Sequence, residues 1–429
     1  MNIPVIEVRA WGKLVGALAP DPKFGYYAFA YHKSWRRLGM ELAPITMPVT
    51  DFRETFIFPN LPEATFRRLP GMFADALPDD FGNALIDVWM AEHGTLKSQV
   101  TALDRLAYMG KRGMGALEFK PALGSHREST APLKMKSLVE EARKAVEGDL
   151  SADLHAKAAL ANIIRVGTSA GGTRAKAVVA WNPATNQIRS GQFDVAPGFE
   201  PWIVKFDGIG KDFELGTGGD YGRTEYAYYK MATQAGIVMS PCRLLEENNR
   251  AHFMTRRFDR DVVGGKTVKH HVQTLCAMND LDFKQRGTHA YSQLFMTLSQ
   301  LGLSDAAIQQ AFLRMAFNVM SRNCDDHTKN FSFLLKQGQS WELAPAYDVT
   351  HAHNPKGEWT YQHLMSVNAK FDEITRKDLL AEADRFGVPR KQELLGDVHS
   401  ALDNWTEHAK VAGLSQGKTD ELRRDFVLL

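Results

Sequence analysis

The chain has 429 residues, with 52 Lys or Arg against 50 Asp or Glu, a formal net charge of +2. This length allows two or three domains, and the balanced charge neither requires nor excludes nucleic acid. Three scattered cysteines argue against a disulfide-stapled secreted domain, and the sequence has no signal segment or membrane span. We therefore expect a globular cytoplasmic protein with no membrane partner.

The beginning of the chain predicts a small β-rich module. Apolar or alternating segments separated by Pro, Asp and Gly turns are typical of strands, and helical runs follow them. The strand segments are 5–8, 14–18 and 26–31, and the helical segments are 83–92 and 97–109. We expect a first subdomain over 1–125. The glycines in 111–119 are expected to serve backbone geometry, because no helix opens directly behind them.

A Gly-rich turn between two apolar strands occupies 163–181, after a polar linker at 124–132 and two helices within 134–161. A Walker A loop would lead into a helix, whereas β-branched residues and an Asn-Pro turn follow here, so a flap over nucleotide phosphates fits better. Ser169 adds a hydroxyl where phosphates would sit. An ordinary hairpin is the alternative interpretation.

The next strand, 201–206, carries one lysine, Lys205, in the context where a kinase lysine contacts nucleotide phosphates. A lone strand lysine is more often a solvated edge residue. Glu225 lies in the first turn of a predicted helix that begins near 223. It either orients Lys205 or interacts favourably with the helix dipole.

Residues 251–260 alternate apolar and polar side chains and then break at Gly264 and Gly265. We place the hinge between two lobes here, which gives an N-lobe over 126–260 and a C-lobe over 261–429. Phe258 is a candidate contact for the adenine ring. The alternative is that Phe258 belongs to the core and that Arg257 pairs structurally with Asp259.

The strongest site signal is the polar turn 323–330. It follows an apolar helical stripe behind Ser304, whose members are Ile308, Phe312, Met315 and Val319. Asp325 is followed five residues later by Asn330 and, after a hairpin, by Asp348. This order is typical of phosphotransferases in which one carboxylate faces the substrate hydroxyl while Asn and the later Asp hold magnesium.

The segment 351–359 is predicted to be an irregular polar loop. Two histidines one residue apart, His351 and His353, raise the alternative of a metal site, but no further Cys or His nearby completes a zinc set. We favour a loop that touches substrate or fixes the site. The remaining chain predicts amphipathic helices, with a capped start at Thr375 and an interruption at 386–389.

Taken together, these motifs resemble the HipA family of bacterial serine/threonine kinases, the toxins of HipBA-type modules. The resemblance spans nearly the whole chain. Its most specific parts are the turn 325–331 and the segment 347–349. It implies an α+β, protein-kinase-like, two-lobed fold, with a small N-terminal β-rich subdomain and a mostly helical C-terminal lobe.

The same resemblance implies the roles of the site residues. Asp325 matches the catalytic acid, Asn330 and Asp348 match the magnesium ligands, and Ser169 matches the serine whose autophosphorylation inactivates the family's kinases. The implied contacts with ATP are Lys205, Ser169, Ala170, Gly171, Gly172, Phe258, His327 and Lys329. Asp326 is then a neighbour of the catalytic acid.

The family precedent also implies ATP and Mg²⁺ as cofactors. It implies an aminoacyl-tRNA synthetase as protein substrate and a helix-turn-helix antitoxin of the HipB type as partner, with DNA reached only through that partner. Two other functions stay open. One is a metal-dependent nuclease or phosphohydrolase using Asp325, Asp326, His327 and Asp348. The other is an ATP-binding transcriptional co-regulator that acts with the antitoxin.

Overall fold

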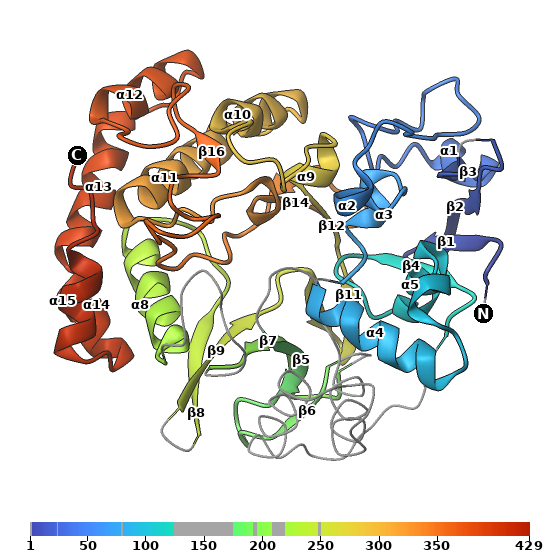
Figure 1. Cartoon of the computed structure of the whole chain (residues 1–429), viewed down its shortest axis with the longest axis horizontal. Coiled ribbons are helices and arrows are strands. Elements are labelled where there is room, and N and C mark those ends of the chain that lie inside the picture. Colours follow the sequence, from blue (N-terminus) through green and yellow to red (C-terminus); the bar gives the residue numbers. More distant parts are fainter. Residues whose placement is uncertain are drawn as a thin grey trace. The chain divides into compact units, whose positions relative to one another are not determined.

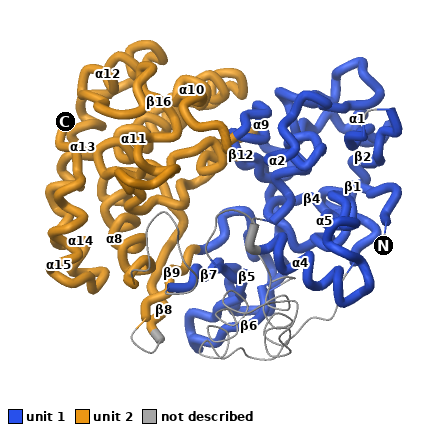
Figure 2. Tube along the Cα trace, in the orientation of Figure 1, with its two compact units in different colours: residues 1–210, 256–282, 334–340 blue, residues 211–255, 283–333, 341–429 orange. Residues whose placement is uncertain are grey.

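The computed structural model describes residues 2–23, 25–78, 80–123, 175–191, 195–207, 219–247 and 250–429. The chain forms two compact units, and we describe each by itself (Figure 2). Unit 1 contains residues 1–210, 256–282 and 334–340, and unit 2 contains residues 211–255, 283–333 and 341–429. Among the described residues, no helix is long and apolar enough to cross a membrane.

Unit 1 begins with an antiparallel sheet of four strands in the order β3-β2-β1-β4 (Figure 1). Its strands are β1 (Ile6–Ala10), β2 (Lys13–Pro20), β3 (Tyr27–Tyr31) and β4 (Leu117–Lys120). In β1 the side chains alternate between buried and half-buried, because successive residues of a strand point to opposite faces. The three predicted strands are confirmed.

Helices follow the first three strands along the chain. They are α1 (Lys33–Leu38), α2 (Glu63–Phe66), α3 (Gly71–Ala74), α4 (Asp80–Glu92), the 3-10 turn η1 (Lys97–Gln99) and α5 (Ala102–Met109). The expectation of one helix over 97–109 is wrong. Thr101 accepts a hydrogen bond from the Asp104 amide at 3.1 Å, and Asp104 accepts one from the Thr101 amide at 3.0 Å. This capping box begins a new helix at Ala102.

The second part of unit 1 is a set of strands with one short helix. Its elements are β5 (Lys176–Trp181), β6 (Ile188–Ser190), β7 (Glu200–Lys205), β10 (Arg260–Val263), β11 (Lys266–Lys269), β12 (His271–Thr274) and α9 (Leu275–Met278). β5 pairs antiparallel with both β6 and β7. The β10–β11 hairpin turns at Gly264 and Gly265. The hinge between two lobes that the sequence analysis places here stays a prediction.

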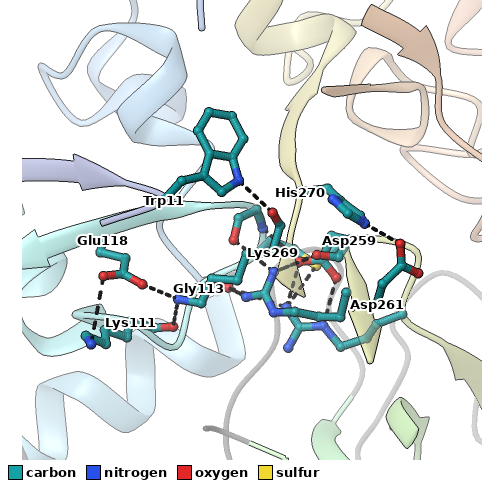
Figure 3. A network of polar contacts seen from close by, with 12 residues as sticks. Trp11, Lys111, Gly113, Glu118, Asp259, Asp261, Lys269 and His270 are labelled. Atoms are coloured by element: carbon teal, nitrogen blue, oxygen red, sulfur yellow. Dashed lines mark hydrogen bonds and ion pairs between the residues drawn. The ribbon is translucent and has the colours of Figure 1, made fainter. Parts of the chain in front are cut away.

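A buried carboxylate, Asp259, joins the two parts of unit 1 (Figure 3). Arg257 donates to it through Nε at 2.9 Å and Nη2 at 2.8 Å, and Arg260 donates through Nη1 at 2.6 Å. The Gly115 amide adds a bond at 2.8 Å, and Arg260 Nη2 donates to the Gly113 carbonyl at 2.8 Å. Gly115 has a φ of +79°, a conformation that side-chain-bearing residues rarely adopt. Gly115 therefore serves backbone geometry.

Lys269 makes a second connection between the two parts of unit 1, beside Asp259 (Figure 3). Its Nζ donates to the Lys111 carbonyl at 2.8 Å and to Glu118 at 2.9 Å, while its own carbonyl accepts from the Trp11 indole at 2.7 Å. Burial lowers the pKa of Lys269 to about 8, with Arg260 contributing in the same direction and Glu118 opposing it. Hydrogen bonds from β11 thus hold the N-terminal sheet at several points.

Unit 2 is mostly helical, as expected for the C-terminal lobe. Its helices are α8 (Tyr221–Gln234), α10 (Tyr291–Gln300), α11 (Asp305–Ser321), η2 (Thr328–Asn330), α12 (Arg376–Arg385), α13 (Lys391–Asp403), α14 (Trp405–Ala412) and α15 (Gln416–Arg423). Its strands are β8 (Cys242–Glu247), β9 (Arg250–Arg256), β13 (His289–Ala290), β15 (Trp341–Leu343) and β16 (Met365–Ser366), and β14 (Ser332–Leu335) begins in this unit. The predicted interruption at 386–389 falls between α12 and α13.

The core of unit 2 lies around α11, whose residues from Ala311 to Ser321 are all buried. α11 packs against α13, and α8 packs against α13 and α14 (Figure 1). Tyr228 of α8 donates to the Ser321 carbonyl at 2.6 Å and contacts the rings of Phe317 and Trp405 edge to face. These contacts fix the end of α11 and hence the start of the polar turn.

Asp259→Asn should destabilise the protein by about 3 kcal/mol, because it leaves Arg257 and Arg260 buried without their anion. Burial alone raises the pKa of Asp259, but the two arginines more than offset this and hold it well below its usual range. Its stabilising contribution is therefore present above about pH 4 and is lost as the pH falls below that. Urea unfolding at several pH values measures both effects.

Asp261→Asn is the matched control. Asp261 pairs with His270 at 2.7 Å, but its side chain is 54% exposed, so its loss should cost about 1 kcal/mol or less. Equal losses for the two variants would contradict the role given to Asp259.

Candidate active site

The polar turn after α11 has two faces. Arg322 ends the helix with a φ of +57°, and from Cys324 onward burial alternates residue by residue. Residues 324, 326 and 328 are buried, whereas 325, 327 and 329 are half-buried. Alternation of this kind is typical of extended chain with one side on a core. The outer face therefore carries the three residues expected to act on substrate and nucleotide: Asp325, His327 and Lys329.

Asp325 is fixed on both its backbone and its side chain. Asn330 donates from Nδ2 to the Asp325 carbonyl at 2.7 Å, and Trp359 donates from Nε1 to Asp325 Oδ1 at 3.1 Å. His327 Nε2 lies 3.7 Å from the same oxygen. The side chain of Asp325 remains 41% exposed. Among the described residues, the side-chain contacts of Trp359 and His327 are both made with Oδ1.

The charge around Asp325 favours a proton on it. Burial of the carboxyl by the surrounding loops raises its pKa, and the Asp348 and Asp326 carboxylates act in the same direction. His327 and the Trp359 indole lower the pKa. Because the side chain is still partly open to water, the rise is moderated by solvent. An acid so placed can take a proton from a hydroxyl more readily than a fully solvated carboxylate.

Asp348 is delivered to the same region by backbone pairing. The amide of Cys324 donates to the Ala352 carbonyl at 2.9 Å, which ties the chain after Asp348 to the start of the turn. The preceding Tyr347 donates to the Lys329 carbonyl at 2.6 Å. Asp348 itself has a φ of +53°, a conformation that costs a non-glycine residue about 1–3 kcal/mol and is often found at functional sites.

The oxygen ligands expected for magnesium fit this arrangement. Asn330 uses its Nδ2 on the Asp325 carbonyl, so its Oδ1 points the other way. The Asp348 carboxylate raises the pKa of Asp325, and the backbone bond from Cys324 to Ala352 ties the chain after Asp348 to the start of the turn. An amide oxygen and a carboxylate are the hard donors that Mg²⁺ prefers.

His327 and Lys329 lie beside Phe283. The rings of His327 and Phe283 are 5.2 Å apart between centroids, and Lys329 Nζ lies 4.7 Å from the Phe283 centroid. These contacts hold a cation and an imidazole on the outer face of the turn. No pattern in the sequence indicates that Phe283 belongs to this region.

The two histidines of the loop 351–359 pair with the chain terminus. Asp425 Oδ2 lies 2.9 Å from His351 Nε2 and 3.3 Å from His353 Nδ1. The hydrogen bonds from His351 and His353 hold the pKa of Asp425 well below its usual range. In the part of the chain that the structure describes, no group of three or more His, Cys, Asp or Glu side chains could hold a metal ion. The loop fixes the site through Trp359.

Other predicted site residues lie elsewhere in the chain. Lys205, at the end of β7, and Phe258 are half-buried residues of unit 1, whereas Glu225 is a buried residue of α8 in unit 2. A pairing of Lys205 with Glu225 stays a prediction. Arg257 does pair with Asp259, which confirms the ion pair expected in the alternative interpretation of this segment. The expected phosphate loop, Ser169, Ala170, Gly171 and Gly172, lies outside the described residues.

Two contributors to the site escaped the sequence analysis. Trp359 was placed only within a loop, because nothing in the sequence shows that an indole 34 residues after Asp325 reaches it. Asp326 is predicted from the sequence only as a neighbour of Asp325. Residues 325–329 are all polar, so no alternation of polar and apolar side chains indicates that Asp326 points inward.

Comparison with known families assigns both parts of the chain. Residues 6–120 match the HipA N-terminal domain, and residues 168–405, more than half of the chain, match the HipA-like C-terminal domain. The sheet of unit 1 and the turn of unit 2 fall within these matches. The chain belongs to the HipA family.

Solved structures agree with this assignment at the level of the fold. A structure of HipA, HipB and operator DNA from the Shewanella oneidensis MR-1 toxin–antitoxin system matches with a TM-score of 0.65 at 18% identity, over 98% of this chain and 100% of that chain. The predicted α+β, HipA-like fold is confirmed. The Helicobacter pylori proinflammatory kinase CtkA matches 53% of this chain and 88% of its own, at 13% identity and a TM-score of 0.34, too low to support an argument.

Trp359→Phe should raise the pKa of Asp325, because the indole hydrogen bond to Oδ1 stabilises the charged carboxylate and the phenyl ring cannot replace it. A carboxyl-carbon NMR titration measures this, with the resonance assigned from Asp325→Asn. Trp341→Phe, in β15, is the control and should leave the titration unchanged. An unaltered Asp325 titration in Trp359→Phe would refute the contact.

Proposed function

We propose that this protein is an ATP- and Mg²⁺-dependent serine/threonine protein kinase of the HipA type. The observation that carries the proposal is the outer face of the turn. Asp325 is held there at its carbonyl by Asn330 and at one carboxylate oxygen by Trp359, with Asp348 in the same site. Phosphoryl transfer needs mainly positioning and charge stabilisation from the protein, which such a site supplies.

In this proposal Asp325 Oδ2 accepts the hydrogen bond of a Ser or Thr hydroxyl and orients its oxygen for attack. Trp359 keeps the carboxylate from rotating by holding Oδ1. Asn330 and Asp348 would hold magnesium, which when bound neutralises phosphate charge as the transferred group separates. Lys329 and His327, placed on the same face, would contact the nucleotide.

Lys205 is proposed as the lysine that contacts the α- and β-phosphates. It stands directly opposite Lys176 in the β5–β7 register, and Lys176 is only 4% exposed. Two lysines opposite each other on neighbouring strands would bring two positive charges to the phosphates of a bound nucleotide. Phe258, half-buried between buried Arg257 and Asp259, would contact the adenine ring.

Our proposals for the regulation and the partners of this protein rest on the family resemblance. Phosphate on Ser169 would add nearly two negative charges to the loop expected to hold ATP phosphates, so ATP binding should be lost. The HipA–HipB–DNA complex of the similar structure supports a HipB-type antitoxin as partner, with DNA reached through it. An aminoacyl-tRNA synthetase is the protein substrate proposed from the family precedent.

The metal-dependent hydrolase is disfavoured by the position of Asp326. Its Oδ1 accepts from the Leu364 amide at 2.7 Å, and its Oδ2 accepts from Tyr291 at 2.7 Å and lies 2.9 Å from His363 Nδ1. A carboxylate with both oxygens bound to protein groups is a poor partner for Asp325 in a two-metal site. The other alternative, an ATP-binding transcriptional co-regulator, differs from the kinase in that it transfers no phosphate. The next experiment measures phosphate transfer.

Asp325→Asn should lower phosphoryl transfer by about 100-fold or more, because the amide cannot accept the hydroxyl proton. The measurement is incorporation of labelled phosphate from Mg²⁺ and ATP, followed by mapping of the phosphosite, which we expect to be Ser169. Asp305→Asn, an exposed carboxylate in the first turn of α11, is the control and should behave as wild type.

Two results would contradict the proposal. Equal incorporation by wild type and Asp325→Asn would remove Asp325 from the chemistry. Hydrolysis of DNA or phosphoesters without ATP would favour the hydrolase instead.

A further inference from the structure

The inner face of the turn carries a polar network that the proposed chemistry does not use. The side chain of Asp326 is fully buried and that of His363 is 1% exposed. Tyr291, at the start of α10, donates to Asp326 and accepts from Asn318 Nδ2 at 3.0 Å. Asn323 Nδ2 in turn donates to Asn318 Oδ1 at 2.9 Å. The chain of bonds therefore leads from α11 and α10 to the residue after Asp325.

One part of this network has the order of a nucleophilic triad. Cys324 Sγ lies 3.8 Å from His363 Nε2, and His363 Nδ1 lies 2.9 Å from Asp326. Such an order is typical of enzymes with an activated thiol. Cys324 is 0% exposed, however, and no substrate can reach a nucleophile without exposure. The three side chains must therefore serve the structure around them.

The surroundings of His363 favour its charged form. Burial by itself lowers its pKa, but the Asp326 carboxylate more than offsets that effect, Cys324 adds to it, and the pKa rises to about 10. The charged and titratable groups that face it are Asp326 and Cys324 on the turn, Tyr291 of α10 through its bond to Asp326, and Asp372, whose own pKa responds to His363. These surroundings favour an imidazolium on His363 beside the buried Asp326 side chain.

We propose that Asp326 and His363 are positioning residues, whose buried pair sets the two faces of the turn and thereby directs Asp325 toward the substrate. The proposal rests on the proposed kinase function for its effect on turnover. Asp326 is bound through both oxygens, so its side chain cannot leave the inner face. Because the residues alternate, the neighbouring Asp325 must then face outward.

The pair also links the turn to a distant part of the chain. The segment 363–364 lies directly before β16, whose Met365 pairs in parallel with His289 of β13. Tyr291 follows β13 within two residues. Asp326 therefore gathers three donors from two chain segments that meet beneath the site, and removing one partner would leave a buried charge alone.

The test compares Asp326→Asn and His363→Gln with wild type in the full chain. Hydrogen exchange measured by mass spectrometry reports on the amides of residues 322–331, and steady-state kinetics separate kcat from the KM for ATP. Asp378→Asn is the matched control. It also removes a carboxylate that accepts several bonds, from Thr375, Asn368 and Lys370, but on α12.

We expect faster exchange over 322–331 in both variants and a fall in kcat of about 100-fold that exceeds the rise in KM for ATP. Asp325 is then misplaced, while the proposed nucleotide contacts outside the turn, Lys205 and Phe258, persist. The double variant should lose no more than the worse single variant, since the two residues act as one unit. Asp378→Asn should speed exchange only near α12 and keep kcat.

A nitrogen-detected NMR spectrum of the histidines covers the case in which neither variant folds. In wild type at about pH 8, above the ordinary histidine pKa, His363 should still carry both ring protons. A neutral His363 at that pH would overturn the proposal, as would normal exchange and kcat in folded variants. If wild type transfers no phosphate, the kinase function fails, while exchange and the ring spectrum still decide whether the pair holds the turn.

Discussion

A buried carboxylate must be matched by donors and positive charge, and this requirement shapes both units of the protein. In unit 1, Asp259 collects two arginines and the Gly115 amide, and so connects the N-terminal sheet to the β10–β11 hairpin. In unit 2, Asp326 collects Tyr291, His363 and the Leu364 amide beneath the polar turn. Each set of bonds is satisfied only when segments far apart in the sequence come together.

The outer face of the turn depends on this inner anchoring. Asp325 and Asp326 are adjacent in sequence but differ in surroundings, since one is 41% exposed and the other is fully buried. Two like residues thereby acquire different surroundings, and our proposals assign chemistry to the exposed one and structure to the buried one. The strained φ of Asp348 and the bond from Asn330 to the Asp325 carbonyl fit the same pattern, in which tertiary contacts hold a site in place.

Much of the fold could be predicted because it follows from local rules. The alternation in β1, the capping box at Thr375 and the apolar stripe of α11 each indicate an element from a few neighbouring residues. The break at Thr101 was missed because the helical pattern continued past a cap. The spacing of Asp325, Asn330 and Asp348 pointed to the candidate site, since it reflects a chemistry with a fixed order.

What the sequence could not supply are contacts made across long separations. The bond from Trp359 to Asp325, and those from His363 and Leu364 to Asp326, join residues 34 to 38 positions apart through a loop with no regular period. The pairing of His351 and His353 with Asp425 likewise depends on where the chain terminus packs. Such contacts are set by tertiary packing, which single-sequence patterns do not encode.

The central claim is that the outer face of the turn is a metal and nucleotide site built on Asp325, Asn330 and Asp348. A crystal structure with Mn²⁺ and a non-hydrolysable ATP analogue tests it most directly, because the anomalous signal of Mn²⁺ locates the ion. We predict the ion on Asn330 Oδ1 and the Asp348 carboxylate, with the terminal phosphate facing Asp325. An ion bound away from both residues, with the nucleotide elsewhere or absent, would contradict the claim.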